Sequence, residues 1–172
     1  MIATKTKNAV AAAIVGSALL LSGCGVFSKE LRTELIIDSS PEKVWSALTD
    51  FEQFPNWNPM IRKVEGQPEP GEKLSVFVQA KGAKGMAFTP TVTKVEPNRE
   101  LRWLGTLGIS GLFDGEHIFT LEATDDNSIK FVHREQFNGL LIPILMPFIQ
   151  EDTLRGFGDM NLALKTLVEG LK

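Results

Sequence analysis

The chain has 172 residues, of which 43% are hydrophobic and 23% are charged, and its formal net charge at pH 7 is -3. This composition is typical of one globular domain. Because the net charge is mildly negative and no run rich in Lys or Arg is present, the sequence lacks the electrostatic footprint of a nucleic-acid-binding protein. The chain contains one cysteine, which excludes an intramolecular disulfide.

Residues 1–23 have the layout of a secretory signal peptide. Lys5 and Lys7 precede an uncharged run over residues 9–21, which is short for a transmembrane helix. The sequence LSGC at residues 21–24 resembles the lipobox of bacterial lipoproteins. This resemblance implies cleavage before Cys24 and acylation of its sulfur. The alternative is a plain secretory signal with a chance cysteine.

A lipidated Cys24 would anchor the protein to a membrane surface, since each buried acyl methylene contributes about 0.8 kcal/mol. Residues 24–30 are predicted to form a short tether that spans about 20 Å at most, so that the domain over residues 31–172 lies close to the lipid headgroups. Gly25 stands where enterobacterial lipoproteins retained in the inner membrane carry Asp. We therefore expect a lipid-anchored protein of the bacterial cell envelope, on the periplasmic side of the outer membrane if the organism has two membranes.

The domain is predicted to begin with a strand over residues 31–37. A helix follows, because Ser40 is a suitable N-cap and Pro41 suits the first helical position. The aromatic and proline-rich residues 51–59 have room for one more helical turn before the chain bends.

Strand-like periodicity then replaces the helical pattern. Six strands are predicted, at residues 61–65, 73–79, 86–96, 100–105, 113–123 and 128–137. The segments between them contain Gly, Pro, Asn and Asp, which favour turns. Since these connections are short, neighbouring strands are expected to pair antiparallel.

Residues 147–172 are predicted to form a long amphipathic helix. Its apolar face consists of Ile149, Thr153, Leu154, Phe157, Met160, Asn161, Leu164, Leu167, Val168 and Leu171. Gly156 and Gly158 do not favour a helix, because each costs about 1 kcal/mol relative to alanine. Either they allow close packing against a sheet, or they leave room for a ligand beside Phe157.

This order of elements predicts an α+β fold of the helix-grip type. A curved antiparallel sheet of about six to seven strands would wrap around the long C-terminal helix, with one or two short helices after the first strand. The sequences SPEKVWSALTDF at residues 40–51 and FPNWNP at residues 54–59 resemble the opening of the SRPBCC superfamily, which includes START domains and polyketide cyclases. The resemblance covers residues 31–171 and implies a deep cavity for an apolar compound between the sheet and the helix.

The last two predicted strands carry both histidines and an inward-facing carboxylate. If residues 125–127 form a three-residue hairpin loop, His117 lies opposite Glu135 and His133 lies opposite Phe119. Such a pair could hold the polar end of a ligand or act as a general base. The alternative is a satisfied polar contact at the rim of the sheet.

No metal or cofactor is predicted. Two histidines on adjacent strands without a third assured ligand make an incomplete zinc site. The sequence also lacks a phosphate-binding loop and a dinucleotide-binding glycine pattern.

Aromatic residues, one methionine and the polar residues are the candidates for lining a cavity. They are Trp57, Trp103, His117, Phe119, Phe131, His133, Glu135, Phe148, Phe157 and Met160. Residues 139–148 are uncharged and contain two prolines, which suggests either the mouth of the cavity or a buried start of the helix. On a lipid-tethered protein such a segment can also touch the bilayer.

Three functions remain open at this point. The first is an envelope lipoprotein that binds a small hydrophobic molecule, such as a lipid, a polyketide-like compound or an aromatic compound. The second is an enzyme resembling cyclases or isomerases, in which His117, His133 and Glu135 move protons, although no catalytic motif is recognisable. The third is a non-catalytic interaction protein whose cavity is filled by its own side chains. The sequence predicts no particular protein partner.

Overall fold

The computed structural model describes residues 13–14, 19–22, 26–79, 82, 84–124 and 127–170. Cys24 and most of the predicted signal peptide lie outside the described residues, so lipidation remains a prediction. Two short segments of this region, β1 (Ala13–Ile14) and β2 (Leu19–Ser22), pair antiparallel with the strand that opens the domain.

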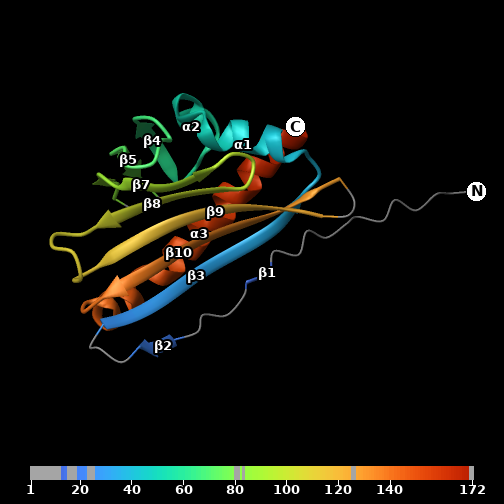
Figure 1. The fold of residues 1–172 in the computed structure, drawn as a ribbon. Coiled ribbons are helices and arrows are strands. Elements are labelled where there is room, and N and C mark those ends of the chain that lie inside the picture. Colours follow the sequence, from blue (N-terminus) through green and yellow to red (C-terminus); the bar gives the residue numbers. More distant parts are fainter. Residues whose placement is uncertain are drawn as a thin grey trace, which may run out of the picture.

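An antiparallel 7-stranded sheet forms the base of the domain. Its strand order is β1-β3-β10-β9-β8-β7, with β2 also paired to β3. The five longer strands are β3 (Val26–Ile37), β7 (Thr91–Glu96), β8 (Glu100–Thr106), β9 (Asp114–Ala123) and β10 (Ile129–Gly139). One long helix, α3 (Ile142–Glu169), crosses one face of this sheet (Figure 1). The predicted helix-grip fold is therefore confirmed.

Short helices follow β3 and lie over one end of α3 (Figure 1). They are α1 (Pro41–Thr49), the 3-10 turn η1 (Phe51–Gln53) and α2 (Phe54–Trp57). The predicted N-cap is confirmed, because the Ser40 side chain accepts a hydrogen bond from the backbone N–H of Lys43 at 3.4 Å.

The predicted single strand over residues 86–96 is wrong. The chain forms β6 (Met86–Phe88) and β7, which belong to different sheets. Pro90 lies between them; it has no N–H for a strand ladder, while its carbonyl accepts a hydrogen bond from the N–H of Leu74 at 2.9 Å. The smaller sheet contains β4 (Ile61–Glu65), β5 (Ser75–Val78) and β6.

The first strand begins five residues earlier than predicted. Residues 26–30 were predicted as part of a tether. Residues 27–30 pair with the second half of β10, so that Phe27 lies opposite Gly139 and Glu30 lies opposite Gln136. The reason is the length of β10, whose backbone groups need a partner as far as Gly139. Only residues 24–25 remain between the predicted cleavage site and the strand.

Helix α3 also begins five residues earlier than predicted. Pro143 lies in its first turn, where a missing N–H costs no helical hydrogen bond. Residues 139–148 are therefore mostly helical, and they form neither an open loop nor a fully buried segment. Ile142 and Met146 are buried, whereas Ile144 and Phe148 are exposed.

Candidate functional site

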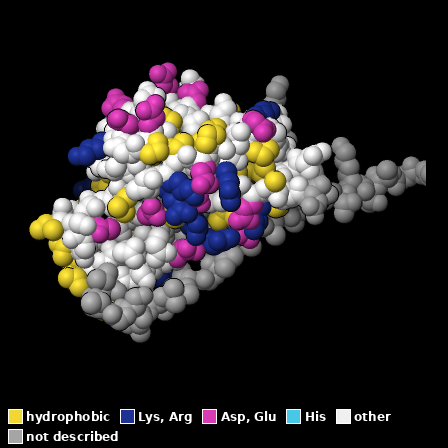
Figure 2. Space-filling view, in the orientation of Figure 1, with side chains coloured by type: hydrophobic (Ala, Val, Ile, Leu, Met, Phe, Trp, Pro, Cys, Tyr) yellow, Lys and Arg dark blue, Asp and Glu magenta, His cyan; other side chains and the backbone are white. Residues whose placement is uncertain are grey.

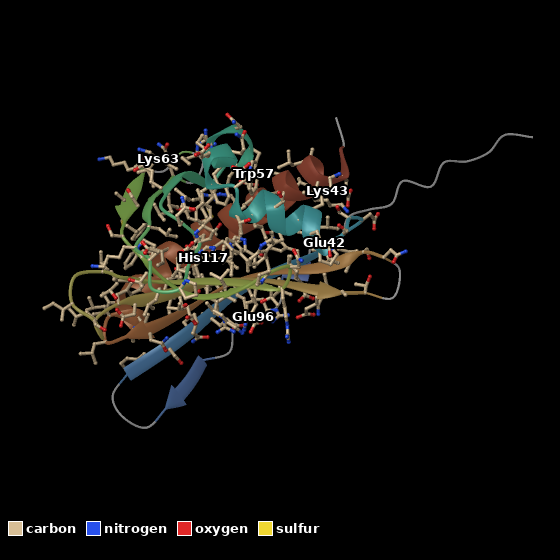
Figure 3. All side chains as sticks on the ribbon, turned by 45° about the horizontal axis from the view of Figure 1, so that its top comes forward. Glu42, Lys43, Trp57, Lys63, Glu96 and His117 are labelled. Carbon is tan, nitrogen blue, oxygen red and sulfur yellow. The ribbon has the colours of Figure 1, made fainter. Side chains whose placement is uncertain are left out.

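The predicted register of the last hairpin is confirmed. His117 on β9 lies opposite Glu135 on β10, and His133 lies opposite Phe119. Both histidines point toward the layer between the sheet and the helices, where Figure 3 shows His117. His133 is fully buried and His117 is 7% exposed.

A continuous chain of polar contacts runs through this layer. His133 Nδ1 lies 2.8 Å from Asn161 Oδ1 on α3, and Asn161 Nδ2 donates a hydrogen bond to Thr33 Oγ1 on β3 at 2.9 Å. On the other side, His133 Nε2 lies 2.7 Å from His117 Nε2. His117 Nδ1 in turn lies 3.7 Å from Glu135 Oε2. The chain thus connects three strands and the long helix.

These contacts determine where the protons lie. Since the Asn161 amide nitrogen donates to Thr33, its oxygen accepts the Nδ1–H of His133. Burial, together with the neighbouring His117, holds the pKa of His133 well below its usual value, although the hydrogen bond to Asn161 acts in the opposite direction. His133 is therefore neutral, and its Nε2 lone pair accepts the Nε2–H of His117. The remaining His117 nitrogen, Nδ1, faces Glu135.

Glu135 is the solvent-accessible end of this polar chain. Its side chain is 19% exposed, compared with 8% for His117. The carboxylate lies over the backbone of Gly115, where a Cβ atom would come within 2.6 Å of Glu135 Oε1. Glycine at position 115 therefore makes room for the carboxylate beside the imidazole.

Aromatic rings enclose the two imidazoles. Phe157 of α3 stacks on His133 with ring centroids 3.8 Å apart, and Trp103 of β8 stacks on His117 at 5.3 Å. Phe119 meets His117 edge-on at 4.7 Å. Phe131 and Met160 are also fully buried. These predicted ligand-lining residues therefore pack against one another and the histidines.

The structure does not bring Trp57 and Phe148 to the histidines. Phe148 is 80% exposed in the first part of α3. Trp57, at the end of α2, packs edge-on against Phe54 and lines an open apolar groove of about 610 Å³ with Leu162 and Leu167 of α3. The sequence suggested both residues through their aromatic character, and Phe148 also through the uncharged segment 139–148. Neither signal specifies a location.

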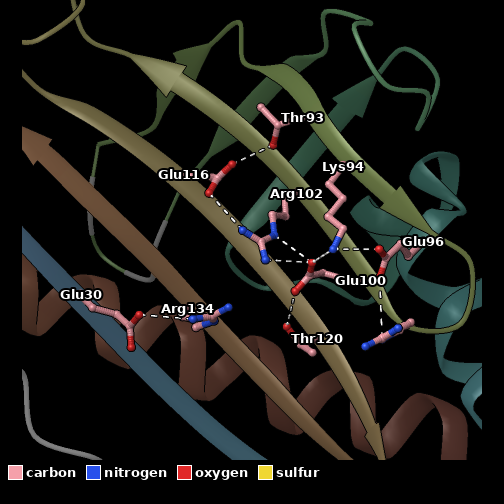
Figure 4. Close-up of polar contacts among 10 residues, drawn as sticks. Glu30, Thr93, Lys94, Glu96, Glu100, Arg102, Glu116, Thr120 and Arg134 are labelled. Carbon is pink, nitrogen blue, oxygen red and sulfur yellow. Dashed lines mark hydrogen bonds and ion pairs between the residues drawn. The ribbon is translucent and has the colours of Figure 1, made fainter.

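A second hollow, of about 680 Å³, lies on the outer face of the sheet and is lined mainly by charged residues. There Lys94 and Arg102 each contact Glu100, and Arg102 also contacts Glu116 (Figure 4). Burial raises the pKa of Glu100, but the hydrogen bonds from Lys94 and Arg102 outweigh this effect and lower it overall. Among the described residues, each charged side chain that lines this hollow has a partner of opposite charge.

Neither hollow matches the deep cavity that the family resemblance implies. Both lie outside the layer that contains His117 and Glu135. Beside the histidines, the ring of Phe157 stacks on His133 and meets His117 edge-on.

Asn161 and Thr33 are the site residues that sequence reasoning missed. Asn161 appeared only as a member of the predicted apolar helix face, and Thr33 only as part of the first strand. A polar amide in the middle of an apolar stripe was the available signal, since buried amides need hydrogen-bond partners.

Within the described residues, no group of three or more His, Cys, Asp or Glu side chains is placed to hold a metal ion. No helix in this part of the chain combines the length and the hydrophobicity needed to cross a membrane.

Comparisons with known proteins agree with this architecture. A family described as polyketide cyclase / dehydrase and lipid transport matches residues 29–169. Among solved structures, a START superfamily protein from Mycobacterium smegmatis is 20% identical, with a TM-score of 0.65, over 83% of this chain and 99% of the other. Truncated norcoclaurine synthase from Thalictrum flavum is 16% identical, with a TM-score of 0.67, over 88% of this chain and 100% of the other.

A protein from Mesorhizobium loti is 22% identical, with a TM-score of 0.62, over 83% of this chain and 98% of the other. At these identities the solved structures establish the fold. No curated protein matches the chain significantly.

Proposed function

Because the chain belongs to the family of polyketide cyclases, dehydrases and lipid-transport proteins, we propose that it binds a hydrophobic molecule in the layer between the sheet and α3. One observation carries the proposal: the partly exposed Glu135 carboxylate lies beside His117 at the end of an otherwise aromatic interior. Apolar enclosure would supply the affinity, and this pair would orient the ligand.

The chemistry of the pair narrows the class of ligand. A carboxylate accepts hydrogen bonds, so Glu135 favours a hydroxyl or an amine at the polar end of the ligand and repels a carboxylate. The neutral His133 cannot change this preference, because its two ring nitrogens are already engaged by Asn161 and His117. The preferred ligands are therefore lipid-like, polyketide-like or aromatic compounds with a hydroxyl or amino group.

Binding requires Phe157 to move. Its ring is fully buried and stacks on His133, so a ligand that reaches the histidines must displace it. Phe157 stands between Gly156 and Gly158, and two glycines weaken the helix in this turn. We propose that this turn of α3 opens to admit the ligand.

The proposed location is the bacterial cell envelope, with an acyl anchor on Cys24. The support is the sequence pattern of residues 1–24. The anchor would hold the binding domain beside a source of hydrophobic molecules.

An enzyme is the second candidate function. It is favoured by the ordered contacts from Thr33 to Glu135, which fix the proton on His117 Nε2 and leave Nδ1 and the carboxylate to act on a substrate. A cyclase-like or isomerase-like proton transfer would use this pair as its base.

The first test is native mass spectrometry of the domain from Gly25 onward, followed by organic extraction of anything bound. We expect a stoichiometric apolar molecule in the wild type. Glu135→Gln should weaken binding of that molecule by about 10-fold, since a hydrogen bond to a charged group contributes about 1.5–3 kcal/mol. Glu122→Gln, which changes an exposed carboxylate of the same hairpin, should leave affinity unchanged.

Two outcomes would change this view. An empty protein that also fails to bind a panel of lipids, quinones and aromatic alcohols would contradict the binding function and favour an interaction protein with a filled interior. A Glu135→Gln variant that binds normally but no longer converts the bound molecule would favour the enzyme.

A further inference from the structure

One end of the domain presents five exposed apolar side chains. They are Leu107 at 46% exposure, Ile109 at 72%, Leu140 at 52%, Ile144 at 60% and Phe148 at 80%. Figure 1 shows the β8–β9 loop, the start of β3 and the start of α3 at this end, opposite α1 and α2. In Figure 2, hydrophobic side chains gather at the same end of the molecule. We call these five residues the apolar tip.

The apolar tip is one surface built from two segments. The N–H groups of Leu140 and Leu141 donate hydrogen bonds to the carbonyls of Gly111 and Leu112, at 3.0 and 2.9 Å. Gly139 permits this contact, since a Cβ atom there would lie 2.2 Å from the Leu112 carbonyl oxygen. The β8–β9 loop is therefore held against the start of α3.

The two segments that form the apolar tip carry no charge. Residues 104–113 and 139–150 contain no Asp, Glu, Lys or Arg. Among the charged residues that border these segments, Asp114 is turned back into the loop, where its Oδ2 accepts hydrogen bonds from the Gly111 N–H at 2.8 Å and the Ser110 hydroxyl at 3.3 Å. Glu151 and Asp152 are exposed and lie one helical turn beyond Phe148. Burial of the five side chains of the apolar tip therefore desolvates apolar groups, and the nearest charged side chains lie at its border.

The start of the domain lies at the same end. Phe27 pairs with Gly139, which immediately precedes Leu140. Cys24 is three residues before Phe27, and three extended residues span at most about 11 Å. A lipid anchor on Cys24 would thus enter the membrane beside the apolar tip.

We propose that the apolar tip is a membrane-contact surface that inserts into the boundary between lipid headgroups and acyl chains. The short anchoring segment and the absence of charge favour a bilayer over a protein partner, whose binding sites usually have a polar rim. Glu135 lies four residues before Gly139 on β10, so the proposed ligand site opens close to the bilayer. The proposed lipid anchor on Cys24 supports only the orientation of the domain on the bilayer. Membrane contact of the apolar tip can be tested in a protein that lacks the anchor.

The domain from Gly25 onward is suited to this test because it contains no cysteine. The family match begins at residue 29, the buried core described by the structure begins at Leu31, and the relatives reported above are covered over 98–100% of their length. The family match and the buried core therefore lie outside residues 1–24, although β1 and β2, which pair with β3, are removed with them. Circular dichroism and a thermal melt would check each variant.

The experiment introduces one cysteine in Phe148→Cys, labels it with an environment-sensitive fluorophore, and adds vesicles of phosphatidylethanolamine and phosphatidylglycerol. We expect a blue shift and at least a two-fold rise in fluorescence. The matched control is Leu162→Cys, an exposed position of the same helix near Trp57, which should not respond. No response at position 148, or an equal response at position 162, would overturn the proposal.

Vesicle sedimentation gives a second readout with unlabelled protein. The double variant Ile109→Asn, Phe148→Asn should lower vesicle partitioning by at least 10-fold, whereas Leu162→Asn should leave it unchanged. Concentration-dependent dimers that the double variant abolishes, together with no vesicle binding by the wild type, would assign the surface to self-association and overturn the proposal. Ligand affinity, measured in the absence of vesicles, should be the same in the double variant and the wild type. A failure of the membrane-contact proposal can therefore be told apart from a failure of the proposed ligand binding.

Discussion

At the scale of single residues, His133 shows how a polar group is accommodated in this core. It is fully buried, yet both ring nitrogens have partners, Asn161 on α3 and His117 on β9. Because both partners engage the neutral ring, protonation would disrupt the contact with His117 and place a charge in an aromatic interior. The stability of the domain should therefore depend on pH.

The first prediction concerns this dependence. The folded-state pKa of His133 is lowered, so below an unfolded-state pKa of about 6.5 the unfolded chain binds more protons than the native state, and stability falls as the pH falls. Below about pH 6.5 the loss should approach about 1.4 kcal/mol per pH unit, until the pH reaches the folded-state pKa of His133. Above about pH 6.5 His133 is neutral in both the folded and the unfolded chain, so it causes no change of stability with pH.

Urea unfolding at pH 5, 6, 7 and 8 measures this loss. His133→Gln, which keeps hydrogen-bonding groups but cannot titrate, should show a smaller decrease than the wild type between pH 7 and 5. His117 and Glu135 remain in both proteins, so the difference between the two curves isolates His133. Identical curves would contradict the prediction.

At the scale of the element, α3 contains two glycines with different surroundings. Gly156 lies in a tight contact, whereas Gly158, two residues later, faces open space. A Cβ atom at Gly156 would lie 2.9 Å from Met60 Sδ, whereas one at Gly158 would meet nothing within 4 Å. Gly156 thus serves close packing, but against Met60 between α2 and β4 and not against the sheet that the sequence interpretation named. Gly158 has no such packing reason.

The second prediction contrasts these two glycines. Gly158→Ala should raise the free energy of unfolding by about 0.5–1 kcal/mol, because alanine favours the helix and restricts the unfolded chain. Gly156→Ala should be less stable than Gly158→Ala by at least about 1 kcal/mol, since Met60 must move to admit the methyl group. Chemical denaturation of both variants tests the order, and a more stable Gly156→Ala would refute the packing argument.

The same pair bears on ligand binding. If the turn around Phe157 opens to admit a ligand, Gly158→Ala should bind that ligand more slowly than the wild type, because alanine stabilises the closed helix. The substitution leaves Glu135, the proposed contact for the polar end of the ligand, unchanged. Stopped-flow binding of the ligand identified by mass spectrometry would measure the rate.

At the scale of the whole molecule, the proposed anchor, the apolar tip and the partly exposed Glu135 lie toward the same end of the sheet. The pairing of β3 with β10 produces this arrangement, because it brings the first residues of the domain beside the start of α3. The opposite end carries α1 and α2, far from the proposed membrane.

The third prediction addresses the anchor itself. In a bacterial host with two membranes, the full chain should incorporate labelled palmitate and fractionate with the outer membrane, and Cys24→Ser should abolish the labelling. Gly25→Asp provides a matched control, which should remain acylated but move to the inner membrane of an enterobacterial host. A wild-type protein recovered unlabelled from the soluble periplasm would contradict lipidation.

Local sequence signals were sufficient for much of the fold. The N-cap at Ser40, the alternation along β9 and β10 and the stripe along α3 are properties of short segments, so their elements and even the pairing of His117 with Glu135 were predictable. Boundaries were less certain. Both β3 and α3 begin earlier than predicted because each end is stabilised by partners distant in sequence.

The sequence by itself determined the fold class, the inward orientation of both histidines and the candidate anchor at Cys24, because each follows from periodicity or from a contiguous motif. Only the tertiary structure decided that Asn161 and Thr33 complete the polar chain, that Phe157 occupies the space beside His133, and that Phe148 lies at an exposed tip. The physical reason is that hydrogen bonds and packing join residues from β3, β9, β10 and α3 that are separated by up to 128 positions, and no local pattern encodes which of them meet.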